Sequence, residues 1–381
     1  MERYGLVLAG GGGKGAYQIG AWRALKEMEI AFDAIAGVSI GSINGELIDS
    51  DEYDKAVEMW NSVSVDKGVR ISENLPDPEN LFSKKNWSTL FRELVKNKGI
   101  DASPAKEFIS QYIDEDKVRK SYIDFCMIAV QMSNGMTPRE LSIRDIPEGQ
   151  LIDYLMASSN VPFMTNIGPE GEKFLDGGAY DNIPVATLKK RGYNRLVIID
   201  ISNIKGVAHN LDIFNSQIVY VRPYDLDDLG ASFDFDKETI EKRLQLGYLD
   251  TKKAFSQLLG KIYYFLPETF RSMVRLYGAD TVLKLEKMAH ELKVPQTEIY
   301  TAETFILAVK QAYEKFISES NESSDESEDA KNESNVTAEN EKDKESGSEK
   351  SLIAALKKRF EKKKPFEEYE DTIEFLENYA I

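Results

Sequence analysis

Residues 32–41 of the chain read FDAIAGVSIG, an apolar run that leads directly into a serine flanked by two glycines. A short apolar run is typical of a buried parallel strand, and residues 40–48 are compatible with a helix. In the G-x-S-x-G pattern the serine occupies a tight strand-to-helix turn that exposes its hydroxyl group. Ser39 is therefore a candidate nucleophile, with the N–H of Ile40 facing a developing oxyanion. The alternative is an ordinary glycine–serine turn, because the pentapeptide is short.

A glycine run, GGGGKG at residues 10–15, precedes this motif by one supersecondary unit. It follows the apolar residues 4–9 and precedes a helical pattern over residues 16–28. Glycines let the backbone approach a ligand closely and present several N–H groups to an anion. The run therefore predicts an anion-binding loop between a strand and a helix.

Three kinds of anion site are alternative interpretations of this loop. Gly10, Gly12 and Gly15 fit the dinucleotide pattern G-x-G-x-x-G, but the next acidic residue, Asp33, leads straight into the serine motif. A Walker phosphate loop needs Ser or Thr after Lys14, where Gly15 stands. An oxyanion hole for acyl transfer is the interpretation that explains why a serine motif comes next.

A serine hydroxyl needs a base, and the chain has two histidines, His209 and His290. The other candidate base is Asp176, in the stretch FLDGGA at residues 174–179. Two glycines after the aspartate suggest an unhindered turn at a strand end. A plain Asp-Gly turn is the alternative interpretation of this dipeptide.

Three blocks of this sequence, in this order and at this wide spacing, resemble the signature blocks of the patatin-like phospholipases. They are the glycine run, the pentapeptide GVSIG at residues 37–41, and Asp176-Gly177-Gly178. Residues 157–163, ASSNVPF, resemble the loop before the aspartate block, and residues 181–184, DNIP, the segment after it. The resemblance covers about residues 4–202, roughly half of the chain, and the three blocks in series are far more specific than any one.

The resemblance implies hydrolysis of phospholipid or other lipid esters by a Ser-Asp dyad, without a metal or organic cofactor. Ser39 would be the nucleophile and Asp176 its base, with the backbone of Gly11, Gly12 and Gly13 forming most of the oxyanion hole beside Ile40. An aspartate with its ordinary pKa of about 3.9 is a poor base, so Asp176 must lie in a largely dry pocket. Lys14 stands where many family members have Arg. An oxyanion hole formed by backbone N–H groups should tolerate this difference. The remaining motif glycines are Gly10, Gly15, Gly37, Gly41, Gly177 and Gly178.

Other mechanisms and functions remain open at this point. Ser39, Asp176 and His209 have the chain order of an α/β-hydrolase triad, although His209 lies in a polar stretch typical of an exposed loop. An acyltransferase would use the same acyl-serine, and a non-catalytic lipid-binding or scaffold protein could retain the pocket.

Composition limits the classes of partner and compartment. The chain has 381 residues with a net charge of −17, which argues against nucleic acid as a partner. Its one cysteine, Cys126, excludes an internal disulfide framework and is expected to be buried in a strand. With no apolar signal core and no run of about 18 apolar residues, we expect a cytoplasmic protein.

We expect an α/β fold with a mostly parallel central sheet, helices on both faces and a helical C-terminal addition. Its strands are predicted near residues 4–9, 32–38, 122–131, 173–176 and 195–200. The predicted organisation is a patatin-like catalytic domain over residues 1–210, a helical addition or lid over 211–317, a disordered acidic linker over 318–350, and amphipathic helices over 351–381.

The last segment carries a candidate membrane contact. Leu352, Ile353, Leu356 and Phe360 share one helical face, and lysines and an arginine surround it between residues 357 and 364. A basic amphipathic helix is attracted to an anionic membrane surface, so residues 352–364 could hold the enzyme peripherally at its lipid substrate. The alternative is that the two tail helices pair with each other or dock on the main domain.

Overall fold

The computed structural model describes residues 3–64, 100–132, 135–160, 164–165, 168–169, 171–202, 216–333 and 369–379. The chain divides into two compact units, Met1–Gln257 and Leu258–Ile381. The first unit contains the central sheet, the glycine run, the serine motif and the aspartate block.

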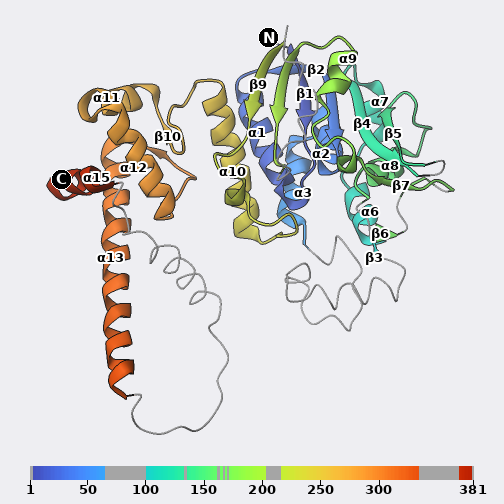
Figure 1. Cartoon of the computed structure of the whole chain (residues 1–381). Coiled ribbons are helices and arrows are strands. Elements are labelled where there is room, and N and C mark those ends of the chain that lie inside the picture. The colour runs from blue at the N-terminus through green and yellow to red at the C-terminus, as the bar shows by residue number, and fades with distance from the viewer. Residues whose placement is uncertain are drawn as a thin grey trace. The chain divides into compact units, whose positions relative to one another are not determined.

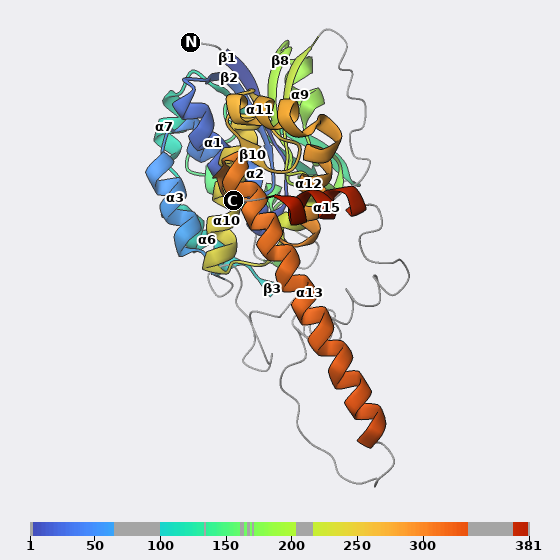
Figure 2. The ribbon, with the colours of Figure 1, turned by 90° about the vertical axis from the view of Figure 1, so that its left-hand side faces the viewer.

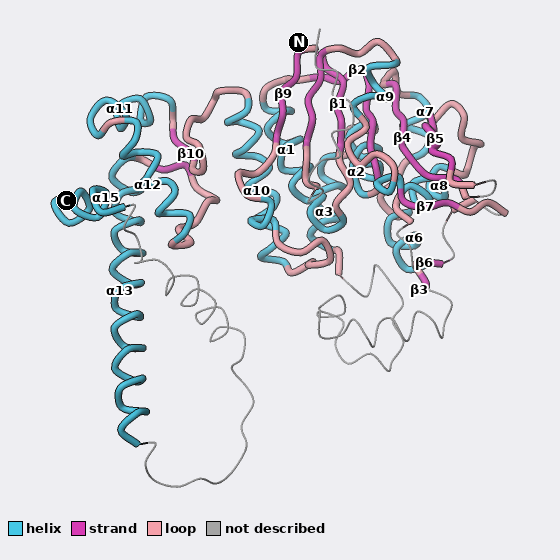
Figure 3. Tube along the Cα trace, in the orientation of Figure 1, coloured by secondary structure: helices cyan, strands magenta, loops and turns pink. Residues whose placement is uncertain are grey.

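The first unit is built on a seven-stranded sheet with the order β5-β4-β2-β1-β8-β9, in which β7 also pairs with β4 (Figures 1 and 3). The strands are β1 (Arg3–Leu8), β2 (Ala31–Val38), β4 (Asp124–Gln131), β5 (Thr137–Ser142), β7 (Phe174–Asp176), β8 (Arg195–Ile199) and β9 (Gln217–Val221). A separate parallel pair joins β3 (Ile100–Asp101) to β6 (Met164–Thr165).

Five strands of the sheet, β4, β2, β1, β8 and β9, run parallel, whereas β5 and β7 are antiparallel to β4. The predicted α/β class with a mostly parallel sheet is therefore confirmed, and the strands predicted from apolar runs are all present. Two strands of this sheet were not predicted. The β5 strand has exposed polar residues over most of its length, and β9 lies in the region that we expected to be helical.

Helices cover both faces of this sheet. On one face Val185 and Leu188 pack against a cluster that includes Val7, Ala34 and Cys126. On the opposite face Gly45 lies against Ile35, Phe125 and Leu8. The helices of this unit are α1 (Ala16–Glu27), α2 (Ile40–Asp49), α3 (Tyr53–Ser62), α6 (Ser103–Ser110), α7 (Glu115–Lys120), α8 (Leu151–Ser158), α9 (Val185–Lys190) and α10 (Lys237–Ala254), with short 3₁₀ helices at Gly12–Gly15, Gly177–Ala179 and Leu226–Leu229.

The close crossing of α1 and α10 explains why residues 216–257 belong to the first unit. A Cβ atom on Gly20 would overlap the carbonyl oxygen of Leu244, and one on Gly247 would overlap the carbonyl oxygen of Tyr17. The two backbones are therefore in direct contact, and Tyr17 also donates a 2.8 Å hydrogen bond to the buried Asp250. The division into compact units falls after Gln257, whereas the sequence suggested a domain boundary at residue 210.

The second unit is mainly helical and has its own core. It contains α11 (Pro267–Tyr277), α12 (Ala279–Glu291), α13 (Ala302–Glu333), α15 (Glu370–Asn378) and the parallel pair β10 (Tyr264–Phe265) and β11 (Ile299–Tyr300). Figures 1 and 2 both show α11, α12 and α15 gathered around the N-terminal part of α13. Glu286 of α12 accepts hydrogen bonds from three successive backbone N–H groups, those of Lys261, Ile262 and Tyr263.

The C-terminal region differs from the expectation in two respects. Residues 318–333 continue α13, although we expected disorder from residue 318, because a packed helix adds further hydrogen bonds without repeating the cost of nucleation. Tyr369 and Leu376 are buried in the core of the second unit, so the end of the tail docks there. The basic segment 352–364 lies outside the described residues. Among the described helices, none combines the length and the apolarity that a membrane crossing requires.

Candidate active site

Ser39 lies in a strained turn between the carboxyl end of β2 and the first residue of α2. Its backbone has φ 54° and ψ −128°, a combination that L-residues rarely adopt and that costs about 1–3 kcal/mol. A Cβ atom on Gly37 would overlap the carbonyl oxygen of Gly41, and one on Gly41 would overlap that of Leu8. The two motif glycines are therefore required by the closeness of the backbones, as the G-x-S-x-G pattern predicts.

A buried serine on α8 holds this turn. The Oγ atom of Ser158 accepts a 3.1 Å hydrogen bond from the N–H of Ser39 and donates one of 2.6 Å to the carbonyl oxygen of Ile128. It also lies 2.9 Å from the Oγ atom of Ser42. The sequence pointed to residues 157–163 as a family-like stretch but gave Ser158 no role.

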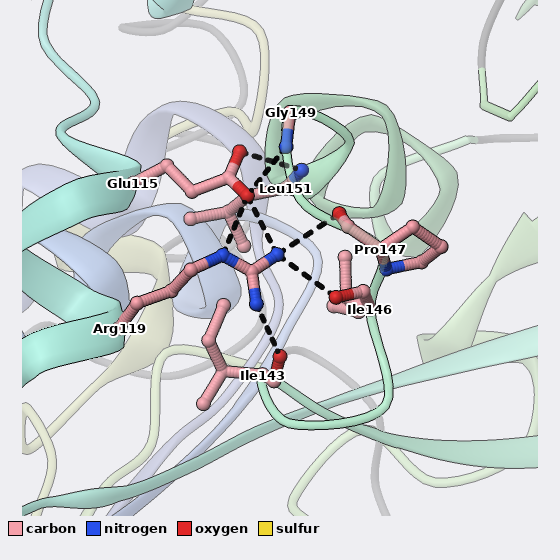
Figure 4. A network of polar contacts seen from close by, with 7 residues as sticks. All are labelled: Glu115, Arg119, Ile143, Ile146, Pro147, Gly149 and Leu151. Carbon is pink, nitrogen blue, oxygen red and sulfur yellow. Dashed lines mark hydrogen bonds and ion pairs between the residues drawn. The ribbon is translucent and has the colours of Figure 1, made fainter.

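The position of α8 is fixed by a polar network at its N-terminus (Figure 4). The Arg119 guanidinium group donates to the carbonyl oxygens of Ile143, Ile146 and Pro147 and pairs with Glu115. The Glu115 carboxylate in turn accepts hydrogen bonds from the N–H groups of Gly149 and Leu151. The loop that leads into α8 is thus held by an ion pair on α7, formed by Glu115 and Arg119.

Asp176 is brought to Ser39 by strand register. It is the last residue of β7 and lies opposite Ala129, whereas β2 ends with Val38 opposite Ile128. Its carboxylate accepts a 2.7 Å hydrogen bond from the N–H of Gly178. Burial raises the pKa of Asp176 above its ordinary value, and hydrogen bonds from the Ser39 side chain and from Gly178 oppose this shift. The carboxylate is thus a stronger base than an exposed aspartate, as a group that takes a proton from a serine hydroxyl must be.

The glycine loop packs directly on the serine. A Cβ atom on Gly10 would lie 3.1 Å from the Cβ of Ser39 and 2.6 Å from the Oδ1 of Asn182. Asn182 is buried and exchanges two hydrogen bonds with Gly10, one through its backbone carbonyl oxygen and one through its Nδ2 atom. Its Oδ1 atom also lies 2.6 Å from the position of a Cβ on Gly178. Asn182 therefore ties the glycine loop to the aspartate block, a role that the sequence did not assign.

The candidate oxyanion donors are not equivalent. The N–H of Gly13 donates a 2.6 Å hydrogen bond to the carbonyl oxygen of Ser232. Within the described part of the chain no partner is recorded for the N–H groups of Gly11, Gly12 and Ile40. Among the predicted donors, Gly13 thus supports the loop through its bond to Ser232.

The remaining motif glycines are explained by close packing. A Cβ atom on Gly15 would lie 2.5 Å from the side chain of Ile40, and one on Gly177 would overlap the carbonyl oxygen of Ile128. The 3₁₀ turn that begins at Gly177 can therefore lie flat against β4. The side chain of Lys14 is buried, and burial lowers its pKa.

His209 lies outside the described residues, and His290 belongs to α12 of the second unit. Cys126 is fully buried in β4, where burial raises the pKa of its thiol to about 12. This burial fits the packing role that the sequence suggested.

Comparisons with known proteins agree with the motif blocks. The model of the family described as patatin-like phospholipase matches residues 6–189. Lysophospholipase NTE1 of Candida glabrata is 29% identical over 207 residues, which is 53% of this chain and 11% of that protein. Lysophospholipase NTE1 of Cryptococcus neoformans is 24% identical over 204 residues, again 53% of this chain and 11% of the relative. The chain thus spans about a tenth of the length of these curated relatives.

Among solved structures, the crystal structure of VipD from Legionella pneumophila aligns with a TM-score of 0.42 at 11% identity, covering 82% of this chain and 80% of that one. The heterodimeric ExoU–SpcU complex from the type III secretion system of Pseudomonas aeruginosa aligns with a TM-score of 0.28 at 17% identity, covering 81% and 66%. The family match itself coincides with the residues that carry the glycine loop, the serine turn and the aspartate block. Through residues 6–189, the chain belongs to the patatin-like phospholipase family.

Proposed function

We propose that this protein is a lipid acyl hydrolase that cleaves fatty acyl esters of phospholipids or related lipids through an acyl-serine. The observation that carries the proposal is the strand register that brings the ends of β2 and β7 together, with Ser39 directly after one and Asp176 at the end of the other, a carboxylate whose pKa burial raises. The family membership and the lysophospholipase relatives support a lipid ester as the substrate class.

The proposed chemistry uses only groups of this chain and water. Asp176 takes the proton of the Ser39 hydroxyl as its Oγ atom attacks the ester carbonyl carbon, and the N–H groups of Gly11, Gly12 and Ile40 stabilise the oxyanion. The protonated Asp176 then gives its proton to the departing alcohol oxygen, which leaves an acyl-serine. Water, deprotonated by Asp176, releases the fatty acid and restores the serine.

Two alternatives share this site. An alcohol acceptor in place of water would make the protein an acyltransferase, and a protein that binds lipid without turnover would keep the fold but not the activated serine. Product analysis with a radiolabelled acyl donor, with and without added alcohol, separates hydrolysis from transfer. Calcium chelation should leave turnover unchanged, because the proposed steps use no metal ion.

The test of the proposal is labelling by a fluorophosphonate probe, which reacts with an activated serine. We expect wild-type protein to be labelled, and Ser39→Ala and Asp176→Asn to be unlabelled although folded. His209→Ala serves as the control and should label like wild type, since the dyad does not use it. Labelling of Ser39→Ala would contradict the nucleophile assignment, and a folded wild type that neither labels nor hydrolyses lipid would favour the binding protein.

A further inference from the structure

A buried arginine on α10 lies behind the glycine loop. Arg243 is fully buried, and its guanidinium group donates to three backbone carbonyl oxygens: Leu229 at 2.8 Å, Ala231 at 2.7 Å and Asp234 at 2.6 Å. These acceptors all belong to the segment 229–234, which follows the short helix Leu226–Leu229. One side chain thus fixes the path of a segment that has little regular structure of its own.

The same segment rests on the glycine loop. The carbonyl oxygen of Ser232 accepts the 2.6 Å hydrogen bond from the N–H of Gly13, and it would lie 2.6 Å from a Cβ on Gly12, where φ is +59°. The Nη1 atom of Arg243 would lie 3.0 Å from a Cβ on Gly13. Contact with Ser232 therefore fixes the orientation of the peptide groups at Gly12 and Gly13, and the guanidinium group lies close to Gly13.

We propose that Arg243 is a positioning residue for the oxyanion loop: through the segment 229–234 it holds the peptide groups of the glycine loop toward Ser39. This inference rests on the proposed function, because it assigns a role in the same acyl transfer. The chain of contacts is short: Arg243 bonds to Ala231 and Asp234 on either side of Ser232, and Ser232 accepts from Gly13. Gly11 and Gly12 are the neighbouring donors.

The chemistry of the side chain explains why an arginine stands here. A guanidinium group offers five N–H donors in a rigid fork, which suits three carbonyl oxygens that diverge from one another. Burial lowers the pKa of Arg243 to about 10, with the charge of Asp234 opposing the shift, so the group stays protonated at neutral pH. A buried positive charge beside the loop also favours negative charge on a bound oxyanion.

The test compares Arg243→Ala and Arg243→Lys with Lys242→Ala, which removes the exposed neighbouring cation on the same helix. Hydrolysis of a water-soluble ester should show kcat reduced about 100-fold in Arg243→Ala with KM changed by less than about threefold, since loss of an oxyanion donor costs about that much. Arg243→Lys should lie between wild type and Arg243→Ala. Lys242→Ala should match wild type.

Restoration of kcat by an added cation distinguishes a positioning role of Arg243 from a purely structural one. Added guanidinium ion, at concentrations far below those that unfold proteins, should restore part of kcat in Arg243→Ala, whereas equal ammonium ion should not. If Arg243→Ala fails to fold, Gly230→Ala provides a milder change, because it strains the same segment at φ +67° without removing the arginine. That variant should also lower kcat at unchanged KM.

The outcomes separate this proposal from the proposed function. An active wild type with unchanged kcat in folded Arg243→Ala, or in Gly230→Ala where Arg243→Ala does not fold, overturns the role of Arg243 and leaves the hydrolase standing. The role of Arg243 is also overturned if guanidinium ion does not restore the activity of Arg243→Ala and KM rises in that variant by the same factor as kcat falls. A wild type that neither labels with fluorophosphonate nor hydrolyses the ester refutes the hydrolase, and the role of Arg243 falls with it.

Discussion

Ser39 directly follows β2 and Asp176 ends β7, and these two strands meet end to end along one edge of β4. Because β5 occupies the other edge over the whole stretch from Cys126 to Gln131, β7 must lie on the side of β2. The register then leaves the two residues facing each other, although they are far apart in the sequence. The geometry of the candidate dyad thus depends on the sheet, and a change in either strand should affect it.

The raised pKa of Asp176 predicts where activity falls on the acidic side of the pH–activity profile. Only the ionised carboxylate can accept the proton of Ser39, so activity should fall as the pH drops through the pKa of Asp176. Since burial raises that pKa above the ordinary 3.8, the midpoint of the limb should lie above this value. The measurement is kcat/KM against pH with an uncharged ester. Asp176→Asn should lose at least about a thousandfold and show no such limb.

The same ionisation should lower the stability of the folded state. A carboxyl group whose pKa is raised by folding stabilises the protein fully below its unfolded pKa, and this contribution is lost as the pH rises through the folded pKa. Asp176→Asn should therefore unfold at a higher temperature than wild type at pH 7, and the difference should vanish under acidic conditions. Tryptophan fluorescence on heating reports this, because all three tryptophans lie in the first unit. The exposed Asp145→Asn is the control, and an Asp176→Asn that is less stable at pH 7 would contradict the prediction.

Much of the central site follows from sequence because its parts are local. Apolar runs before the glycine loop and before Ser39 predicted β1 and β2, and both strands lie where expected. The partners of the loop could not be predicted in this way. Ser158, Ser232 and Arg243 reach the site only through packing of helices and loops from distant parts of the chain, and no short motif encodes such contacts. The strand β9 was missed for a related reason: it is a half-exposed edge strand, with no continuous buried run.

Removing the hydroxyl group of Ser158 should disturb the serine turn. In Ser158→Ala the N–H of Ser39 and the carbonyl oxygen of Ile128 lose a buried partner, which should cost about 1–3 kcal/mol of stability. We expect a smaller kcat as well, since the backbone of the nucleophile is less constrained. Urea denaturation and ester hydrolysis measure the two effects.

The neighbouring serine gives a matched control for this change. The Oγ atom of Ser159 is buried without a hydrogen-bond partner among the described residues, so Ser159→Ala should be neutral or slightly stabilising. Equal losses in the two variants would mean that Ser158 contributes only packing, contrary to the prediction.

The membrane hypothesis for residues 352–364 needs a variant that leaves the second unit intact. Deleting the whole tail would remove Tyr369 and Leu376 from the core of that unit. Replacing the lysines and the arginine at positions 357–359 and 362–364 by glutamine removes the charge alone. Binding to vesicles of phosphatidylglycerol and phosphatidylcholine should weaken, while hydrolysis of a soluble ester should not change. Glutamine at the exposed Lys237 and Lys242 is the control, and vesicle binding that survives the tail substitutions defeats the hypothesis.

Two buried acids in the last turn of α2 predict a further dependence of stability on pH. Burial raises the pKa of Glu46 to about 8 and that of Asp49 to about 7, and the charge of Asp49 adds to the shift of Glu46. Glu46 accepts one hydrogen bond, from the N–H of Asp114, while its Oε2 atom has no partner among the described residues. Negative charge at this end of a helix is also opposed by the helix dipole.

Both carboxyl groups therefore bind protons more tightly in the folded state than in the unfolded chain. Their stabilising contribution is complete below the unfolded pKa values and is lost as the pH rises toward about 8. Glu46→Gln should leave stability nearly unchanged at about pH 4, below the unfolded pKa, and raise it at pH 8 by an amount on the order of a few kcal/mol. Urea denaturation followed by tryptophan fluorescence at the two pH values measures this, with the exposed Glu58→Gln on α3 as control. A shift of equal size at both pH values would assign the effect to packing, because ionisation of Glu46 can act only at the higher pH.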